Sequence, residues 1–242
     1  MTAQIADTGV IRGVVFDMDD TLYPEMQFVQ GGLATAAEAA GERFGVAPHE
    51  LLSSMRTALE RDLAEYGRAR TVFDSALSSC KIDYDPATIA WLVSVYRTHE
   101  PKLTPYPDVR PALAHLAPLA TLALITDGPA SVQRAKYHAL HLAGFFADAI
   151  FTQEHGPKAG KPSPAAFRIV EKLTGLPGPA LVYVGDNPAK DFVGARRLGW
   201  KTVRIRRPGT LHAGVEAQPG LGADAEAASL AELPGLLGLA GE

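Results

Sequence analysis

The chain has 242 residues, 47% of them hydrophobic, and a formal net charge of -4 at pH 7. This composition supports a folded core of one large domain or of a domain with an insertion, and it lacks the basic balance typical of nucleic-acid binding. Cys80 is the single cysteine, so we expect no intrachain disulfide. The beginning of the chain does not resemble a secretory signal, and no apolar run approaches ~18 residues. We therefore expect a soluble cytoplasmic protein with no membrane or nucleic-acid partner.

Short apolar runs rich in β-branched residues alternate with helical patterns along most of the chain. The strand candidates are residues 10–18, 121–126, 149–153, 180–186 and 201–206. The last four are separated by segments of helical length, each with proline near its start and glycine at its end, at 129–144, 163–175 and 188–199. The alternation is typical of βαβ units, so we predict an α/β fold with a Rossmann-like, doubly wound parallel sheet.

The stretch between the first two strand candidates is far longer than one crossover helix requires. Helical composition covers residues 25–45, 48–66, 68–80 and 85–99. We therefore predict a helical cap domain over residues 23–103, inserted into a catalytic core formed by residues 1–22 and 104–242. Two neighbouring connections would let this domain move as a lid, and a rigid extra layer is the alternative. Residues 222–237 are compatible with a short edge strand and a final helix.

The segment VVFDMDDTLYP, residues 14–24, crowds Asp17, Asp19 and Asp20 at the end of a predicted buried strand. Two unit charges ~4 Å apart repel by roughly 4 kcal/mol at an effective dielectric constant of ~20. The cluster therefore needs either wide exposure to solvent or a partner cation.

Further polar residues follow the other predicted strands. In an open parallel sheet, ligands bind outside the carboxyl ends of the strands, where the winding direction reverses. The polar candidates at these ends are Thr126 and Asp127 after the second strand, Asp186, Asn187 and Asp191 after the fourth, and Lys161 before a crossover helix. The sequence thus collects its strongest polar candidates along one edge of the predicted sheet.

Four of these segments, DMDDTLYP, ITDG, KPSPAAF and VYVGDNPAKD, resemble in this order the motifs of the haloacid dehalogenase superfamily. The resemblance spans roughly residues 10–208 and is to phosphatase-type members with a helical cap after the first strand. It implies Mg²⁺-dependent phosphoryl transfer through an aspartyl-phosphate intermediate on a Rossmann-like core. The expected partner is a small-molecule phosphate ester, bound by a monomer or homodimer.

The resemblance assigns roles to the acidic residues. Asp17 is expected to be the nucleophile, and Asp19 the general acid and then the general base, with a pKa raised toward neutrality by its neighbours. The expected Mg²⁺ ligands are Asp17, the Asp19 carbonyl and Asp186. Asn187 and Asp191 are expected behind them, holding a metal-bound water or steadying Lys161.

The phosphoryl group is expected to be bound by Thr126, Lys161 and the backbone of Asp127. Lys158 is the alternative to Lys161, which we prefer because it directly precedes Pro162 and a helix. A carboxylate facing phosphate is unfavourable, so we expect the side chain of Asp127 to turn away and cap the helix that begins near residue 129.

The second acid, Asp19, favours a phosphatase over a dehalogenase. Halide leaves without a proton, whereas an alkoxide needs a positioned acid worth about 10²–10⁴-fold in rate. Tyr23, Arg68 and Arg70 are candidate substrate contacts, and a nucleotide, a sugar phosphate and a small phosphorylated acid all stay open. The alternatives to a phosphatase are a phosphomutase and a binding module without turnover.

Overall fold

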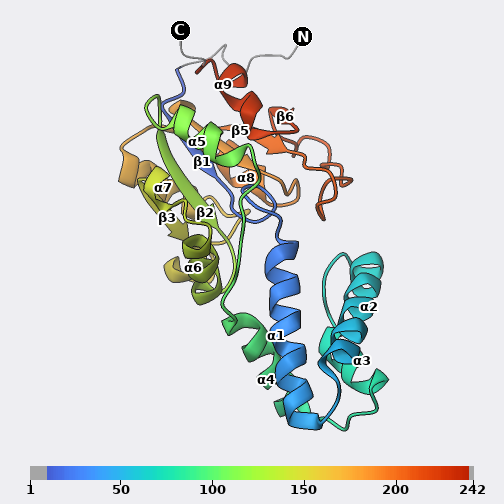
Figure 1. Ribbon diagram of the computed structural model, residues 1–242. Helices are drawn as coiled ribbons and strands as arrows, with labels where there is room; N and C mark the ends of the chain where they lie inside the picture. Colours follow the sequence, from blue (N-terminus) through green and yellow to red (C-terminus); the bar gives the residue numbers. More distant parts are fainter. Residues whose placement is uncertain (1–9, 240–242) are drawn as a thin grey trace. The chain divides into compact units, whose positions relative to one another are not determined.

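The computed structural model describes residues 10–239, which divide into two compact units (Figure 1). One unit contains residues 10–25 and 103–239, and the other is Met26–Lys102. Each has its own hydrophobic core. Within residues 10–239, no helix combines the length and the apolar character needed to cross a membrane. The assignment of catalysis to the first unit and of a cap role to the second stays a prediction.

The first unit is built on a six-stranded parallel sheet, which confirms the predicted α/β fold. Its strands are β1 (Gly13–Phe16), β2 (Thr121–Thr126), β3 (Asp148–Phe151), β4 (Leu181–Gly185), β5 (Lys201–Ile205) and β6 (Ala225–Ala227). The spatial order is β3-β2-β1-β4-β5-β6. Residues of β1 and β4 are buried throughout, as expected for central strands covered on both faces.

The strand order reverses between β1 and β4. From β1 the chain winds outward through β2 and β3, and it then returns to place β4 on the other side of β1. The carboxyl ends of β1 and β4 therefore flank the crevice at the switch point, where ligands of such sheets bind.

The helices of this unit follow the predicted crossovers, with one addition. They are α5 (Val109–Leu116), α6 (Ala130–Ala139), α7 (Ala165–Thr174), α8 (Asp191–Arg196) and α9 (Leu233–Leu236), with the short 3₁₀ turns η1 (Ala143–Phe145), η2 (Thr152–His155), η3 (Gly178–Ala180) and η4 (Leu230–Glu232). Helix α5 was not predicted from the sequence. It packs against η4 and α9, so its apolar face is buried by residues distant in sequence.

The second unit is built of helices alone (Figure 1). They are α1 (Met26–Phe44), α2 (Pro48–Tyr66), α3 (Val72–Ser79) and α4 (Pro86–Thr98). Helix α1 packs against both α2 and α4, and α3 packs against α2 and α4. The Asp85 side chain accepts a hydrogen bond from the Thr88 backbone and so caps α4, while Gly67 ends α2 in the left-handed conformation that glycine adopts without strain.

Candidate active site

Four predicted site residues lie at the carboxyl edge of the sheet or in the loop before α7. Asp17 follows β1, Thr126 ends β2, Asp186 follows β4, and Lys161 reaches in from the loop. All four are buried, with exposed fractions between 0% and 7%. The parallel topology thus brings together residues that are far apart in the sequence.

The backbone leaves the strand and turns in the residues after Asp17. The Asp17 amide still donates to the Val184 carbonyl of β4 at 2.8 Å, but Leu22 N then donates back to Met18 O at 2.9 Å and closes a turn. Asp20 lies in this turn with a φ of 53°, and its carboxylate accepts a hydrogen bond from Glu25 N at 2.9 Å. The bend carries the Asp19 side chain out of the strand alternation.

Asp17, Asp186 and Asp191 form a buried cluster in which one oxygen of each carboxylate lies within 4.8 Å of the others. The ammonium of Lys161 is part of the same cluster. Its Nζ bonds the Asp17 carboxylate, lies 2.8 Å from Asp191 Oδ1, and donates to the Tyr183 hydroxyl at 2.8 Å. One ammonium thus contacts two of the three carboxyl groups, and the cluster holds more acidic than basic groups.

The electrostatics of the cluster show this excess. Burial raises the pKa of Asp17 to about 6, although the neighbouring Lys161 offsets part of the rise. Burial, followed by the charges of Asp17 and Asp191, raises the pKa of Asp186 to about 9. Asp17 and Asp191 in turn outweigh burial and raise the pKa of Lys161 well above its ordinary value, so its ammonium stays charged.

The residues fit a hard divalent cation. Asp186 Oδ2 is buried and has no hydrogen-bond partner among the described residues. Carboxylate oxygens are the ligands that Mg²⁺ prefers, and a divalent ion would offset the excess charge. The cluster includes the Asp191 side chain, which we had expected behind the ligands, and not that of Asp19; the Asp19 carbonyl as a ligand stays a prediction.

Asp191 is held close to the cluster by two features of the chain. Its Oδ2 accepts a hydrogen bond from Asn187 N at 2.8 Å. Gly185 leaves the space for this carboxylate, because a Cβ at that position would lie 2.5 Å from Asp191 Oδ2. The Asn187 side chain itself contacts His212 Nε2 at 2.9 Å and accepts from Ala189 N at 3.0 Å, so it shapes the turn after β4.

The Asp19 carboxylate is held by donors from two directions. Tyr23 OH and Lys136 Nζ donate to its Oδ1 at 2.6 and 2.8 Å, and Gln133 Nε2 donates to its Oδ2 at 2.8 Å. Burial raises the pKa of Asp19, but the Lys136 charge and these hydrogen bonds outweigh burial and lower it below the ordinary value. The expectation that neighbours raise this pKa is therefore wrong for the structure as described.

The Asp127 side chain does not cap α6, contrary to expectation. The N-cap residue, Pro129, offers no side-chain cap, and the first amide of the helix, Ala130 N, donates instead to Gln153 Oε1 from η2 at 2.6 Å. Asp127 Oδ1 accepts hydrogen bonds from Thr152 Oγ1 at 2.8 Å and from Lys161 N at 3.3 Å. The carboxylate thus anchors the loop that carries Lys161.

The two candidate lysines differ clearly in position. Lys161 is buried with its ammonium among the carboxylates, whereas Lys158 is exposed. The hydroxyl of Thr126 accepts a hydrogen bond from Gln133 Nε2 at 2.6 Å. Of the two lysines, Lys161 therefore lies at the acidic cluster, and the binding of a phosphoryl group by Lys161 and Thr126 stays a prediction.

The three candidate substrate contacts lie in different settings. Tyr23 is fully buried and its hydroxyl bonds Asp19. Arg68 and Arg70 lie in the connection between α2 and α3, and both are exposed. The guanidinium of Arg70 lies 4.6 Å from the centre of the Tyr66 ring. Their roles toward a substrate stay predictions.

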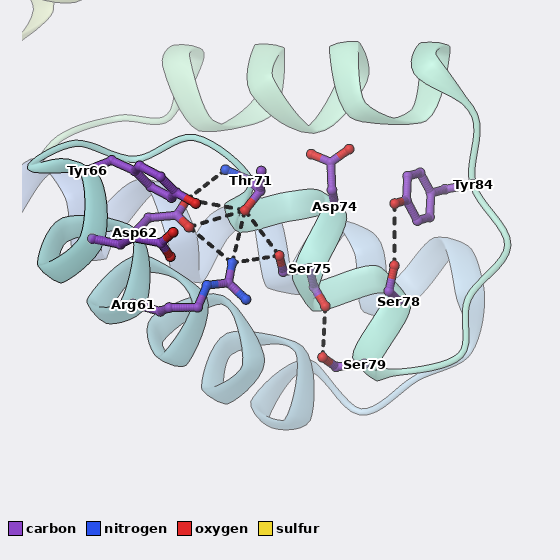
Figure 2. A pocket seen from close by; sticks show the side chains of 10 residues that line it. Arg61, Asp62, Tyr66, Thr71, Asp74, Ser75, Ser78, Ser79 and Tyr84 are labelled. Carbon is purple, nitrogen blue, oxygen red and sulfur yellow. Dashed lines mark hydrogen bonds and ion pairs between the residues drawn. The ribbon is translucent and has the colours of Figure 1, made fainter.

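A pocket of about 670 Å³ lies beside this connection, within the helical unit (Figure 2). Figure 2 shows that its polar side chains bond one another: Arg61 Nη2 donates to Thr71 Oγ1 and to Ser75 Oγ, both at 2.9 Å. The buried Asp62 accepts from the backbone amides of Arg70 and Thr71 at 2.7 and 2.6 Å. These contacts fasten α3 to α2.

Three residues of the site were not predicted from the sequence: Gln133, Lys136 and Tyr183. Gln133 and Lys136 are three residues apart on α6, a spacing that places both on one helix face. That spacing, in a helix that starts at the functional edge of the sheet, is the available signal. Tyr183 lies in an apolar strand, where it is indistinguishable from a core aromatic.

Comparison with known proteins agrees with this geometry. The family model for haloacid dehalogenase-like hydrolases matches residues 11–199. Glyceraldehyde 3-phosphate phosphatases from Methanopyrus kandleri and Methanocaldococcus jannaschii are 34% and 31% identical to the chain, covering 82% and 81% of it and 85% of each relative. The crystal structure of 2-haloacid dehalogenase from Pseudomonas syringae pv. tomato superposes with a TM-score of 0.64 at 29% identity, covering 95% of this chain and 99% of that one. With its motifs at the switch point of the sheet and its helical insertion between β1 and β2, the chain belongs to the haloacid dehalogenase-like hydrolases.

Proposed function

We propose that this protein is a Mg²⁺-dependent phosphatase that hydrolyses a small sugar phosphate, with glyceraldehyde 3-phosphate as the first candidate, through a phosphoryl group carried on Asp17. The relatives named above, at 34% and 31% identity, support the substrate class. The observation that carries the proposal is the buried group of Asp17, Lys161 and Asp186 with the second acid, Asp19, held nearby.

In the first step an oxygen of Asp17 attacks phosphorus, and the bond from phosphorus to the ester oxygen breaks. The electron pair of that bond stays on the leaving oxygen, which takes a proton from Asp19. Because the pKa of Asp19 is lowered in the free protein, this step requires that the negative charge of the bound ester raise that pKa, so that Asp19 is protonated in the complex. Lys161 and the Thr126 hydroxyl hold the oxygens of the transferring group. A bound Mg²⁺ supplies positive charge that offsets the carboxylates and polarises the phosphoryl group.

In the second step a water attacks the same phosphorus. Asp19, now a carboxylate, takes a proton from this water, and the bond between phosphorus and Asp17 breaks. Inorganic phosphate leaves, and the Asp17 carboxylate is restored. Asp19 has therefore regained a proton at the end of one cycle and can act as the acid again.

The burial of Asp17 is consistent with its role. A pKa of about 6 leaves most of the carboxylate ionised at neutral pH, so it can attack. Its position one residue after β1 fixes it against the sheet through the bond from its amide to Val184.

A dehalogenase is the second candidate, because a solved structure with that activity in its name shares the fold at 29% identity. Carbon–halogen cleavage needs no proton donor, so Asp19 would have no catalytic role in that reaction. The position of Asp19 beside Thr126 and α6 therefore supports phosphate ester cleavage.

A panel of phosphate esters and 2-haloacids, each assayed with Mg²⁺ and with a chelator, tests the proposal. We expect phosphate release from sugar phosphates that needs Mg²⁺ and disappears in Asp17→Asn. Halide release without phosphate release would overturn it. In ¹⁸O-labelled water, hydrolysis places solvent oxygen in the released phosphate, whereas a phosphomutase yields a phosphate ester without solvent oxygen.

A further inference from the structure

Two side chains on one face of α6 hold the Asp19 carboxylate. Lys136 Nζ lies 2.8 Å from Asp19 Oδ1, and Gln133 Nε2 lies 2.8 Å from Asp19 Oδ2. Both side chains come from a helix that is distant in sequence from the acidic motif. Neither belongs to the segments that carry the family resemblance.

Lys136 is almost completely buried, with 5% of its side chain exposed, whereas 21% of the Asp19 side chain is exposed. Burying an ammonium is costly unless carboxylates compensate it. Lys136 has Asp19 at 2.8 Å and Glu25 Oε1 at 3.4 Å. The Lys136 ammonium is therefore fixed in the protein and gives the Asp19 carboxylate a rigid partner.

Gln133 connects the same carboxylate to the phosphoryl-binding side of the site. Its amide nitrogen lies 2.6 Å from Thr126 Oγ1 and 2.8 Å from the Asp127 carbonyl, besides the contact with Asp19. A carboxylate and a carbonyl only accept hydrogen bonds, so the nitrogen and not the oxygen of the amide faces them. The amide has two protons for these three acceptors, so the protons are shared among them. When Thr126 accepts one of them, its own proton is free to point at a bound anion.

Asp19 needs such support because it lies in a turn and not in the strand ladder. A general acid must hold its proton within hydrogen-bond reach of the leaving oxygen, and a small misplacement costs much of its effect. We propose that Lys136, assisted by Gln133, is a positioning residue that holds the Asp19 carboxyl at the reacting ester oxygen. This inference rests on the proposed function, since it assigns Lys136 to the acid of that reaction.

The plain structural alternative is an ion pair that fastens α6 to the loop after β1. The two roles differ in how the loss of rate caused by a substitution depends on the leaving group of the ester. An alkoxide such as that of glyceraldehyde 3-phosphate needs the acid, whereas p-nitrophenolate leaves without one. A defect in positioning must therefore be large for the first ester and small for the second, while a defect in packing affects both alike.

The test compares kcat of Lys136→Met with that of the wild type on the two esters. We expect a loss on the order of 10–100-fold on glyceraldehyde 3-phosphate and less than about threefold on p-nitrophenyl phosphate. Asp19→Asn should show the same selectivity, and adding Lys136→Met to it should cost nothing further. Lys136→Gln, which keeps a donor, should recover part of the loss. Arg134→Met, on the same helix and paired with exposed Glu154, is the control and should match the wild type.

Equal losses on both esters, or a further loss in the Asp19→Asn background, would show a structural role and overturn the inference. If Lys136→Met does not fold, Lys136→Gln and Gln133→Leu on the same two esters decide the question by the same selectivity. A wild type without Mg²⁺-dependent phosphatase activity overturns the proposed function, and this inference with it. The two failures are therefore distinguishable.

Discussion

Lys161 and Asp191 form an ion pair in which neither side chain is exposed: Nζ lies 2.8 Å from Oδ1, and both exposed fractions are 0%. Removing one partner of a buried pair leaves an uncompensated charge, which is far more costly than losing an exposed pair. Here the same ammonium also bonds Asp17, so the pair fixes the cation beside the proposed nucleophile.

Asp191→Asn should therefore lower kcat on the order of 10–100-fold, as the loss of a residue that supports metal ligands does. Gly185→Ala should act in the same direction, because its Cβ would displace the Asp191 carboxylate. Steady-state rates on a sugar phosphate check both variants. Glu154→Gln, which removes an exposed charge, is the control, and unchanged rates in Asp191→Asn would show that the pair does not matter for turnover.

Asp186 is predicted to make the free protein less stable and the metal-bound protein more stable. Its carboxylate is buried close to two others, so Asp186→Asn should unfold at the same temperature as the wild type or higher when a chelator is present. Magnesium at 100 times its Kd should stabilise the wild type by about 2.7 kcal/mol and the variant much less. Thermal unfolding with and without Mg²⁺ measures both effects. An equal rise in both proteins would place the metal elsewhere.

Asp62 should make the free energy of unfolding of the helical unit depend on pH in the acidic range. The hydrogen bond from the backbone of Thr71, supported by that from Arg70, lowers the pKa of Asp62 to about 2 although burial opposes this. Because the pKa is lower in the folded protein, the contribution is complete above pH ~4 and is lost as the pH falls through about 2. Urea unfolding should show Asp62→Asn less stable by about 1–3 kcal/mol at neutral pH, with a difference that shrinks below pH 4.

The matched control for this prediction is Asp83→Asn, which changes an exposed aspartate of the same unit. It should follow the wild type at every pH. A difference between Asp62→Asn and the wild type that is constant from neutral pH to pH 2 would contradict the predicted role of the Asp62 charge.

Arg207 joins the segment after β1 to the segment before α5. Its guanidinium donates to the Thr21 carbonyl and to both oxygens of Asp108, all at 3.1 Å, and lies 3.8 Å from the centre of the Tyr106 ring. Lysine cannot reproduce this planar fork. Arg207→Lys should therefore lower the free energy of unfolding by about 1–3 kcal/mol.

The neighbouring Arg206 provides the comparison for Arg207. It pairs with Glu216 and Glu226, whose side chains are 78% and 50% exposed. Arg206→Lys should change the free energy of unfolding by less than about 0.5 kcal/mol. Chemical denaturation of both variants measures the contrast, and equal effects would mean that the fork of Arg207 contributes little.

The sheet and the first group of site residues could be predicted because they depend on topology. Once the strands are known to be parallel, the residues after β1, β2 and β4 must share one edge, so Asp17, Thr126 and Asp186 follow from the order of the motifs. The helical insertion was equally accessible, because its breaks at Gly67 and Asp85 are local signals.

The remaining features depend on packing between distant segments. The amide at the start of α6 is satisfied by Gln153, which no local pattern around Asp127 could show. The low pKa of Asp19 depends on Lys136, whose direction is set by how α6 packs on the sheet. Helix α5 was not predicted because the segment around its beginning is rich in proline. Its stability comes from contacts with η4 and α9, which are distant in sequence.

The central claim is that Asp17 carries the phosphoryl group during turnover. The direct measurement mixes the enzyme with Mg²⁺ and glyceraldehyde 3-phosphate, quenches in acid within one turnover, reduces with borohydride and sequences the peptides by mass spectrometry. An acyl phosphate on Asp17 would be reduced, so we predict homoserine at position 17 in the wild type and none without substrate. Turnover with an unmodified Asp17 at every quench time, or with homoserine at another aspartate, would contradict the account.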